Sequence, residues 1–236
     1  MRTKVEYAEM QKHQYQVTAI NMHVAGNHRS HDANPDYRGI LLAPLDIYKD
    51  RFKDECALDF GCGHGRNVSN MILWFPNLFK RVDGVDISSN NLLYANANLL
   101  KEVGDESKFK LFVNNGMDLA EIESDFYMFA MSTIVFQHIC VHETRFALMS
   151  EIYRVLKSGG IFSLQMGFGQ GHHRAAEYYD NIYDADSTNS GYDTKVTDVE
   201  QLAGDLDKIG FKNIQYNISH RWEDSHQNWI YIHCEK

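Results

Sequence analysis

The chain has 236 residues, of which 44% are hydrophobic and 23% are charged, values typical of a globular protein with one sizeable core. Its formal net charge is −9 without a run of lysines or arginines, which argues against a nucleic-acid partner because phosphate backbones are bound by clustered cations. The sequence contains no apolar stretch of about 18 residues, so we expect no membrane-spanning helix.

The N-terminal region is predicted to form a helical cap over the rest of the protein. Apolar residues recur at helical spacing from Glu6 to Val24, and Gly26 is expected to end this helix. We expect residues 1–50 to act as a cap or lid and residues 51–236 to form a single structural domain. Candidate lid residues within the first region are Tyr15, Tyr37 and Arg38.

Strands and helices alternate along the remainder of the chain. Strands are predicted at residues 57–60, 82–87, 109–113, 126–132, 161–166, 211–218 and 228–234, and helices at 66–75, 88–103, 142–156 and 198–209. This alternation predicts an α/β fold with a doubly wound, mostly parallel, seven-stranded sheet of the Rossmann-like type. The last two strands lack a helix between them, so the final strand is expected to run antiparallel.

The most informative motif is a glycine-rich turn at the end of the first predicted strand. The sequence LDFGCGHG places Gly61, Gly63 and Gly65 between this strand and the helix that follows. Glycine permits a positive φ and allows a ligand to approach the backbone closely, and a helix N-terminus offers free N–H groups. A turn of this kind alone is compatible with several nucleotides.

Acidic residues at three successive strand ends narrow the choice of ligand. Asp59 lies in the first strand, Asp86 ends the second, and Asp118 follows the third beside Met117. A carboxylate at the second position can accept hydrogen bonds from ribose hydroxyls, and one at the third can accept from an adenine amino group. Each acid alone could be a helix cap or a turn residue. Their joint occurrence in order favours an adenosine-containing ligand.

These segments resemble the class I S-adenosylmethionine (SAM)-dependent methyltransferase family from about Asp54 to the C-terminus. The resemblance rests on ALDFGCGHGRN, GVDIS, NNGMD, an apolar strand ending in FQH, and EIYRVLKSGG. It implies a seven-stranded sheet, SAM as the methyl donor and S-adenosylhomocysteine (SAH) as the product.

The resemblance also implies which residues contact the cofactor. The glycine loop and the first acid approach the methionyl part, the second acid holds the ribose, the third acid with its preceding methionine holds the adenine, and a serine lies beside the sulfonium. The cofactor-binding residues implied are Asp59, Gly61, Cys62, Gly63, Gly65, Asp86, Ile87, Met117, Asp118 and Ser132.

Two alternative functions remain beside methyl transfer. A nicotinamide-dependent oxidoreductase has a related fold, but its fingerprint requires glycine or alanine three residues after the second glycine, where this chain has Arg66. Nearby carboxylates also suit the SAM cation better than a pyrophosphate. A non-catalytic scaffold subunit with the same fold is the other alternative, and the intact acids and glycines argue against it.

The acceptor is expected to be a small molecule methylated on oxygen or nitrogen, with a protein side chain as the second possibility. Candidate general bases are His138, His172 and His173, because histidine titrates near neutral pH. His138 could instead simply pack at a helix start, and the other two could be solvated residues of the 167–197 insertion. The pair His138 and His142 has metal-ligand spacing, but without an H-E-x-x-H pattern no metal site is expected.

Cysteine usage bears on the cellular compartment. Cys56, Cys62, Cys140 and Cys234 form no C-x-x-C pair, and the chain is too long to need a disulfide framework, so we expect reduced, mostly buried thiols. Residues 1–22 are polar and charged, unlike a signal peptide. Both observations favour a cytoplasmic location, whereas the sequence does not indicate an oligomeric state.

Overall fold

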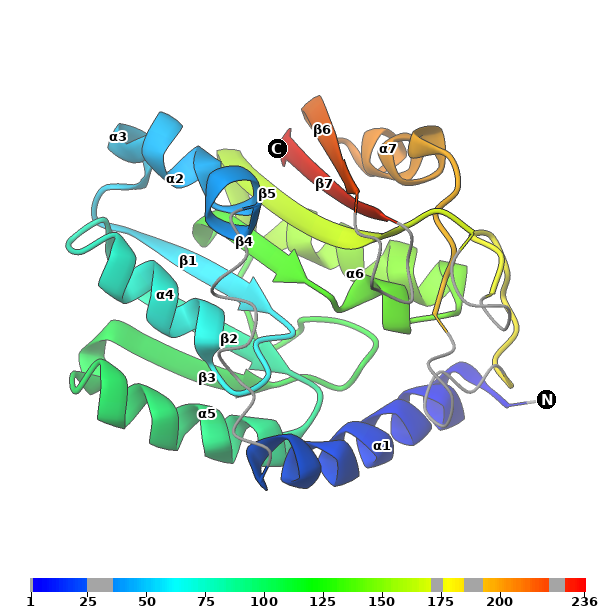
Figure 1. Ribbon diagram of the computed structural model, residues 1–236, viewed down its shortest axis with the longest axis horizontal. Coiled ribbons are helices and arrows are strands. Elements are labelled where there is room, and N and C mark those ends of the chain that lie inside the picture. Colours follow the sequence, from blue (N-terminus) through cyan, green and yellow to red (C-terminus); the bar gives the residue numbers. More distant parts are fainter. Residues whose placement is uncertain (1, 25–35, 171–175, 185–192, 221–227) are drawn as a thin grey trace.

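The computed structural model describes residues 2–24, 36–170, 176–184, 193–220 and 228–236, without the side chains of residues 19–24. A seven-stranded sheet with the order β3-β2-β1-β4-β5-β7-β6 forms its centre (Figure 1). The strands are β1 (Glu55–Phe60), β2 (Phe79–Asp86), β3 (Phe109–Val113), β4 (Tyr127–Thr133), β5 (Leu156–Phe168), β6 (Lys212–His220) and β7 (Asn228–Glu235).

Strand directions confirm the predicted doubly wound fold. Strands β3, β2, β1, β4 and β5 are mutually parallel, and β7 pairs antiparallel with both β5 and β6. The last strand of the chain therefore lies inside the sheet, between two strands that precede it in sequence. The parallel strands bring their carboxyl ends to one edge, which is where ligands bind in sheets of this kind.

Helices cover both faces of the sheet (Figure 1). Helices α4 (Arg66–Trp74) and α5 (Ser89–Glu102) lie on one face, and α6 (His142–Val155) and α7 (Val199–Ile209) lie on the other. Side chains of a strand alternate between the two faces. In β1, Leu58 and Phe60 pack in the core beneath α6, whereas Ala57 packs in the core beneath α4. Asp59 shares the face of Ala57 and reaches the α4 residue Asn67.

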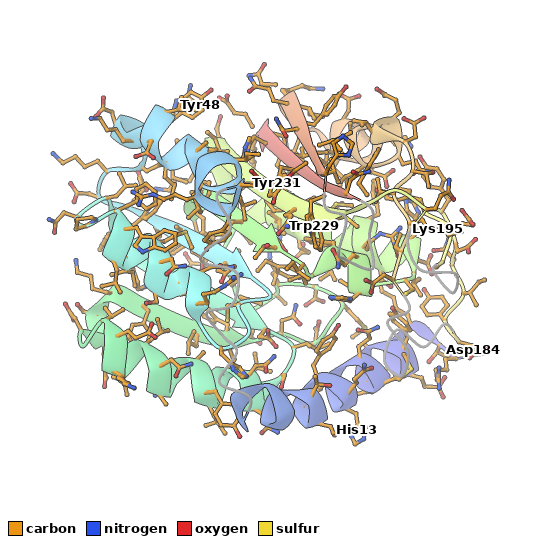
Figure 2. All side chains as sticks on the ribbon, viewed as in Figure 1. His13, Tyr48, Asp184, Lys195, Trp229 and Tyr231 are labelled. Atoms are coloured by element: carbon orange, nitrogen blue, oxygen red, sulfur yellow. The ribbon has the colours of Figure 1, made fainter. Side chains whose placement is uncertain are left out.

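The N-terminal helix α1 (Lys4–Val24) contacts two distant parts of the fold. Near its start, the Tyr7 hydroxyl accepts a hydrogen bond from the Cys140 N–H before α6. Further along, Gln16 Nε2 donates to Ser89 Oγ in α5 at 3.3 Å. The labelled side chain of His13 points away from the body of the protein (Figure 2).

Residues 36–53 belong to the core rather than to a separate cap. They form three short helices: η1 (Tyr37–Leu41), α2 (Ala43–Ile47) and α3 (Lys49–Phe52). Leu41, Leu42 and Phe52 are fully buried in the core on the α4 face. The Leu41 carbonyl accepts a hydrogen bond from the Ser163 hydroxyl of β5, which ties this segment to the middle of the sheet. Gly26, the expected end of α1, lies outside the described residues.

Strand β5 is longer than the sequence predicts. We expected a turn at residues 157–160 before the strand, but β5 begins at Leu156 and includes these residues. The physical reason is pairing with the C-terminus: Gly159 N donates to the Lys236 carbonyl and Lys236 N donates to the Gly160 carbonyl. At this point the pairing of β5 with β4 shifts in register, and Gly159 adopts a positive φ of 77°.

Within the described residues, no helix combines the length and the apolar character that crossing a bilayer requires.

Candidate functional site

A cavity of about 350 Å³ lies at the carboxyl ends of β1, β2 and β4, within the size range of small-molecule sites. Its wall combines the glycine loop, the ends of β2 and β4, the start of α6 and one face of α1. The residues that line the cavity include Tyr7, Gln11, Tyr15, Gly61, Cys62, Gly63, Arg66, Asn67, Asp86, Ile87, Asn91, Asn114, Thr133, Ile134, Val135, His138, Thr144 and Leu148.

At two positions of the glycine loop, the neighbouring residues leave no room for a side chain. Gly61 has a φ of 77°, and an added Cβ would lie 2.2 Å from Val135 Cγ2. Gly65, with a φ of 83°, directly precedes α4, where an added Cβ would meet Ala95 and Leu99 at about 3.2 Å. The loop is fixed to β2 by hydrogen bonds from the N–H groups of Gly61 and Cys62 to the Val85 carbonyl.

Asp86 holds the glycine loop and lines the cavity at the same time. Its Oδ2 accepts from Gly63 N at 2.9 Å, and its Oδ1 accepts from Ser88 N at 2.8 Å and from Asn91 Nδ2 at 3.0 Å. Burial raises the pKa of the carboxyl, and these three donors oppose the shift. A carboxylate has about four acceptor sites, so capacity for a further donor remains.

Asp59 lies beneath the loop, not in the wall of the cavity. It is 0% exposed; its Oδ1 accepts from Asn67 Nδ2 at 3.2 Å, and its Oδ2 has no hydrogen-bond partner. Burial raises the pKa of this carboxyl to about 7, opposed by the Asn67 hydrogen bond and the Arg66 charge. A buried carboxylate oxygen without a donor is costly, so a cationic or N–H-bearing ligand group near it would be stabilised.

The other expected cofactor residues divide between two cavities and the core. Ile87 lines the main cavity with Asp86. Asp118 lines a smaller cavity of about 80 Å³ that shares Val85 and Asn114 with the main one, and its Oδ1 is held by Asn115 Nδ2 at 2.8 Å. Met117 and Ser132 line neither cavity. The Ser132 hydroxyl donates to the Phe60 carbonyl, and the next residues of the chain, Thr133 to Val135, form the wall instead.

One face of helix α1 forms part of the cavity wall. Tyr7, Gln11 and Tyr15 follow one another at helical spacing and all line it. Gln11 Nε2 donates to the Tyr7 hydroxyl at 3.0 Å and to the His138 carbonyl at 3.3 Å. Burial, followed by the charges of Asp193 and Asp86, raises the pKa of Tyr15, so this phenol remains a proton donor.

His138 is the expected base that the structure places in the cavity wall. It lies in a short helical turn after β4, with its ring centroid 6.4 Å from that of Tyr15. Its Nδ1 lies 2.6 Å from Oδ1 of Asp193, a buried residue of the insertion. The carboxylate accepts a hydrogen bond from Nδ1–H, which leaves Nε2 as the acceptor nitrogen of the neutral imidazole. His172 and His173 lie outside the described residues.

His142 takes no part in this site. Its Nε2 lies 2.7 Å from Asp205 Oδ2 in α7, in a cluster with Tyr178. Helical spacing from His138 therefore does not bring the two imidazoles onto one ligand. In the portion of the chain with described coordinates, no group of three or more histidine, cysteine, aspartate or glutamate residues is arranged to hold a metal ion.

Three residues of or behind the wall were not predicted from the sequence. Arg66 directly follows the last glycine of the motif, and this position in the sequence could have indicated that it lines the cavity. Thr144, 2% exposed, presents a hydroxyl without a hydrogen-bond partner, and nothing in its sequence context marks it. Asp193 is one of several acids in a loop of unpredictable course.

Comparison with known proteins gives one family match. Residues 58–164 match the model of a family described as a methyltransferase domain. This segment contains the glycine loop, Asp86, Asp118 and His138. No curated protein gives a significant sequence match.

Solved structures share the fold at low sequence identity. A Haemonchus contortus phosphoethanolamine N-methyltransferase 2 is 20% identical with a TM-score of 0.63, covering 83% of this chain and 52% of that one. This chain thus spans about half the length of that enzyme. A Mesorhizobium loti SAM-dependent methyltransferase is 16% identical with a TM-score of 0.60, covering 87% and 99%. The [4+2]-cyclase SpnF is 16% identical with a TM-score of 0.60, covering 81% and 79%.

The cyclase demonstrates that the fold alone does not determine the reaction. The family match adds the sequence of the glycine loop and the acid that ends β2, both of which line the cavity described above. Together with the seven-stranded topology, these findings show that residues 58–164 resemble a methyltransferase domain and that the described chain has the α/β fold of the solved methyltransferases.

Proposed function

We propose that the protein transfers the methyl group of SAM to an oxygen or nitrogen of a small-molecule acceptor. The observation that carries this proposal is the joint presence of the glycine loop and Asp86 in the wall of one cavity of about 350 Å³. The cavity has room for a small molecule, and Gly63, whose Cβ position has no atom within 4 Å, leaves the backbone open to close approach.

The residues present suit SAM in each of its parts. Asp86 has remaining capacity to accept from a ribose hydroxyl, with Ile87 beside it. Asp118 and Met117, in the loop after β3, are proposed to border the adenine, and Asn114 lines both the main cavity and the smaller cavity that contains Asp118. Asp59, Gly61, Cys62, Gly63 and Gly65 are proposed to surround the methionyl part, and Ser132 to support the adjoining end of β4.

When bound, SAM supplies a methyl group already activated by a positively charged sulfur. The protein therefore contributes mainly position and orientation, which can be worth effective molarities of about 10⁵ M or more. The rigid loop between β1 and α4 and the wall of Thr133, Ile134 and Val135 fix the geometry. Tyr7, Gln11 and Tyr15 of α1 line the cavity, and we expect them to reduce the access of water to a bound cofactor.

Proton removal from the acceptor is assigned to His138. Its Nδ1 is held by Asp193, so the free Nε2 can take the proton of a hydroxyl or an amine as the new bond to carbon forms. Tyr15, which stays protonated, can donate a hydrogen bond to the same acceptor atom. His172 and His173 remain proposed contributors from the insertion.

A small acceptor agrees with the cavity volume of about 350 Å³, and the net charge of −9 disfavours a polyanion such as nucleic acid. The Haemonchus neighbour holds SAH together with phosphomonomethylethanolamine, so a cofactor and a small acceptor can occupy this fold together. A cytoplasmic location is proposed because the four cysteines are free and buried.

Calorimetry with purified protein tests the proposal. We expect SAM and SAH to bind and NAD not to bind. Asp86→Ala should weaken SAM binding by about 10- to 100-fold through loss of a charge-assisted hydrogen bond. The control is Asp125→Ala, an exposed residue before the opposite end of β4. Absence of SAM binding by the wild-type protein would refute the proposal, and copurification with a partner in that case would favour the scaffold alternative.

A further inference from the structure

Arg145 is one of the largest side chains buried completely within the described residues. It lies in the first turn of α6 and is 0% exposed. Its Nη1 donates to the Ile139 carbonyl at 2.6 Å and to Thr194 Oγ1 at 2.9 Å, and its Nη2 donates to the Tyr178 carbonyl. One guanidinium therefore joins the turn after β4 to two separate parts of the 167–197 insertion.

The two acceptors of Nη1 belong to the sequence neighbours of the His138–Asp193 pair. Ile139 directly follows His138, and Thr194 directly follows Asp193. The same nitrogen thus bonds both segments one residue away from the 2.6 Å contact between Asp193 Oδ1 and His138 Nδ1. Because peptide units are planar and of fixed length, a shift of either segment at the guanidinium is passed on to this contact. The Arg145 bonds therefore help to set the distance between the carboxylate and the imidazole.

The insertion has other attachments near Asp193 that do not involve Arg145. Thr194 N donates to the Gln137 carbonyl at 2.7 Å, and Ala176 N donates to the Asp193 carbonyl at 2.9 Å. Gln137 Nε2 adds a longer contact of 3.4 Å to Asp193 Oδ2. Removal of the Arg145 contacts should therefore shift the Asp193 carboxylate without releasing the insertion.

Arg145 is not among the residues that line the cavity, so we expect no direct contact between it and a ligand. Its Cζ lies 4.8 Å from the ring centroid of Tyr178, which is 1% exposed. This cation–π contact and the hydrogen bonds to Ile139, Thr194 and Tyr178 leave the guanidinium little freedom to move. Any influence of Arg145 on the reaction must pass through the segments that it fixes.

We infer that Arg145 is a positioning residue that sets the carboxylate of Asp193 against Nδ1 of His138. The inference rests on the proposed role of His138 as the base. With the carboxylate in place, neutral His138 carries its proton on Nδ1 and keeps Nε2 as the acceptor nitrogen. With the carboxylate displaced, the proton can occupy either nitrogen. The fraction of the enzyme that is ready to take a proton from the methyl acceptor then falls.

Nitrogen-15 NMR of the imidazole tests this inference without SAM or an acceptor. We expect the ratio of the Nδ1–H to the Nε2–H tautomer of His138 to fall by about tenfold in Arg145→Met, because the hydrogen bonds that hold both segments are lost. Thr194→Val removes one acceptor of Nη1, preserves the shape of the side chain and should lower the ratio by about threefold. Arg145→Lys keeps the charge but not the planar fork and should lie between wild type and Arg145→Met.

The matched control is Arg154→Met on the same helix. Arg154 also donates to backbone carbonyls, those of Leu119 and Ile122, but neither of these residues adjoins His138 or Asp193. This variant should leave the tautomer ratio unchanged, and thermal melts should show that each variant is folded at the temperature of measurement. If Arg145→Met does not fold, Thr194→Val decides the question. A wild-type ratio in every folded variant at positions 145 and 194 would overturn the inference.

Kinetics separates positioning from a general loss of structure. Arg145→Met should lower kcat by about tenfold with less than about a threefold change in the KM for SAM. It should cause no further loss in an Asp193→Asn background, because Arg145 acts through Asp193. Losses that multiply in the double variant would overturn the inference. If the wild-type protein binds no SAM in calorimetry, the proposed function fails, whereas the tautomer ratios still decide whether Arg145 positions the pair.

Discussion

Asp193 Oδ1 lies 2.6 Å from His138 Nδ1, although 55 residues separate the two in sequence. The pairing predicts that neutral His138 carries its proton on Nδ1 and leaves Nε2 free toward the cavity. Nitrogen-15 NMR of the imidazole should show this tautomer in the wild-type protein and a mixture in Asp193→Asn. Identical tautomer populations in both proteins would remove Asp193 as a positioning residue.

The same pair makes a kinetic prediction. His138→Ala should lower kcat by about 100-fold or more, and Asp193→Asn by about tenfold, with little change in SAM affinity. The measurement is transfer of labelled methyl from SAM to an acceptor that saturates the wild-type enzyme. The matched control is Asp205→Asn, which breaks the His142 pair outside the cavity and should leave kcat unchanged at temperatures where the protein is folded.

The glycine loop predicts different costs for two alanine substitutions. Gly63→Ala places a side chain at a φ of 52° with nothing within 4 Å of the new Cβ, so only backbone strain of about 1–2 kcal/mol is expected. Gly61→Ala adds a clash with Val135 and should cost more and abolish SAM binding. Denaturant unfolding measures both costs. Combining Gly61→Ala with Val135→Ala should recover part of the loss, and a failure to do so would place the cost elsewhere.

Asp59 predicts an unusual pH dependence of stability. Its folded-state pKa of about 7 is raised above the ordinary value of 3.8, so its contribution is fully present below about pH 4 and is lost as the pH rises through 7. Relative to Asp59→Asn, the wild-type free energy of unfolding should therefore fall by as much as about 4 kcal/mol over this range. Urea unfolding at several pH values measures the difference. Parallel pH profiles for the two proteins would contradict the assignment.

Helix α1 predicts a link between ligand binding and protease resistance. Trypsin can cut after Lys4 and Lys12, and SAM should slow cleavage if α1 closes over the bound cofactor. Tyr7→Phe removes the acceptor of the Cys140 N–H and should loosen α1 by about 1–3 kcal/mol. Faster cleavage of the variant, measured by mass spectrometry, is the expected result. Equal cleavage with and without SAM would argue against closure.

Much of the fold was predictable because its signals are local. Glycines at the ends of elements, Ser88 as a helix cap and the period of apolar residues placed most strands and the longer helices within a few residues. Ser88 Oγ indeed accepts from Asn91 N. The three short helices between Tyr37 and Phe52 were not predicted. The start of β5 was wrong because its pairing partner is the distant C-terminus. The position of residues 36–53 in the core likewise depends on contacts with β5 rather than on local pattern.

The candidate site likewise contains residues that local sequence predicts and residues whose positions depend on distant contacts. Gly61, Gly63 and Asp86 belong to a compact motif, so spacing alone indicated that they would meet. Asp193 could not be assigned because nothing local fixes the course of the insertion. The sequence also did not indicate which side chain at the end of β4 faces the cavity. Ser132 donates to the Phe60 carbonyl, whereas its neighbour Thr133 lines the cavity.

The place of β7 between β5 and β6 affects how the chain can fold during synthesis. Strands β3, β2, β1, β4 and β5 can pair once residue 168 has left the ribosome, but β5 then exposes an unpaired edge. This edge stays open until residues 228–235 emerge, about 60 residues later, and β6 has no neighbour before then. The protein is therefore most exposed to aggregation and to chaperone capture between the emergence of residue 168 and that of residue 235.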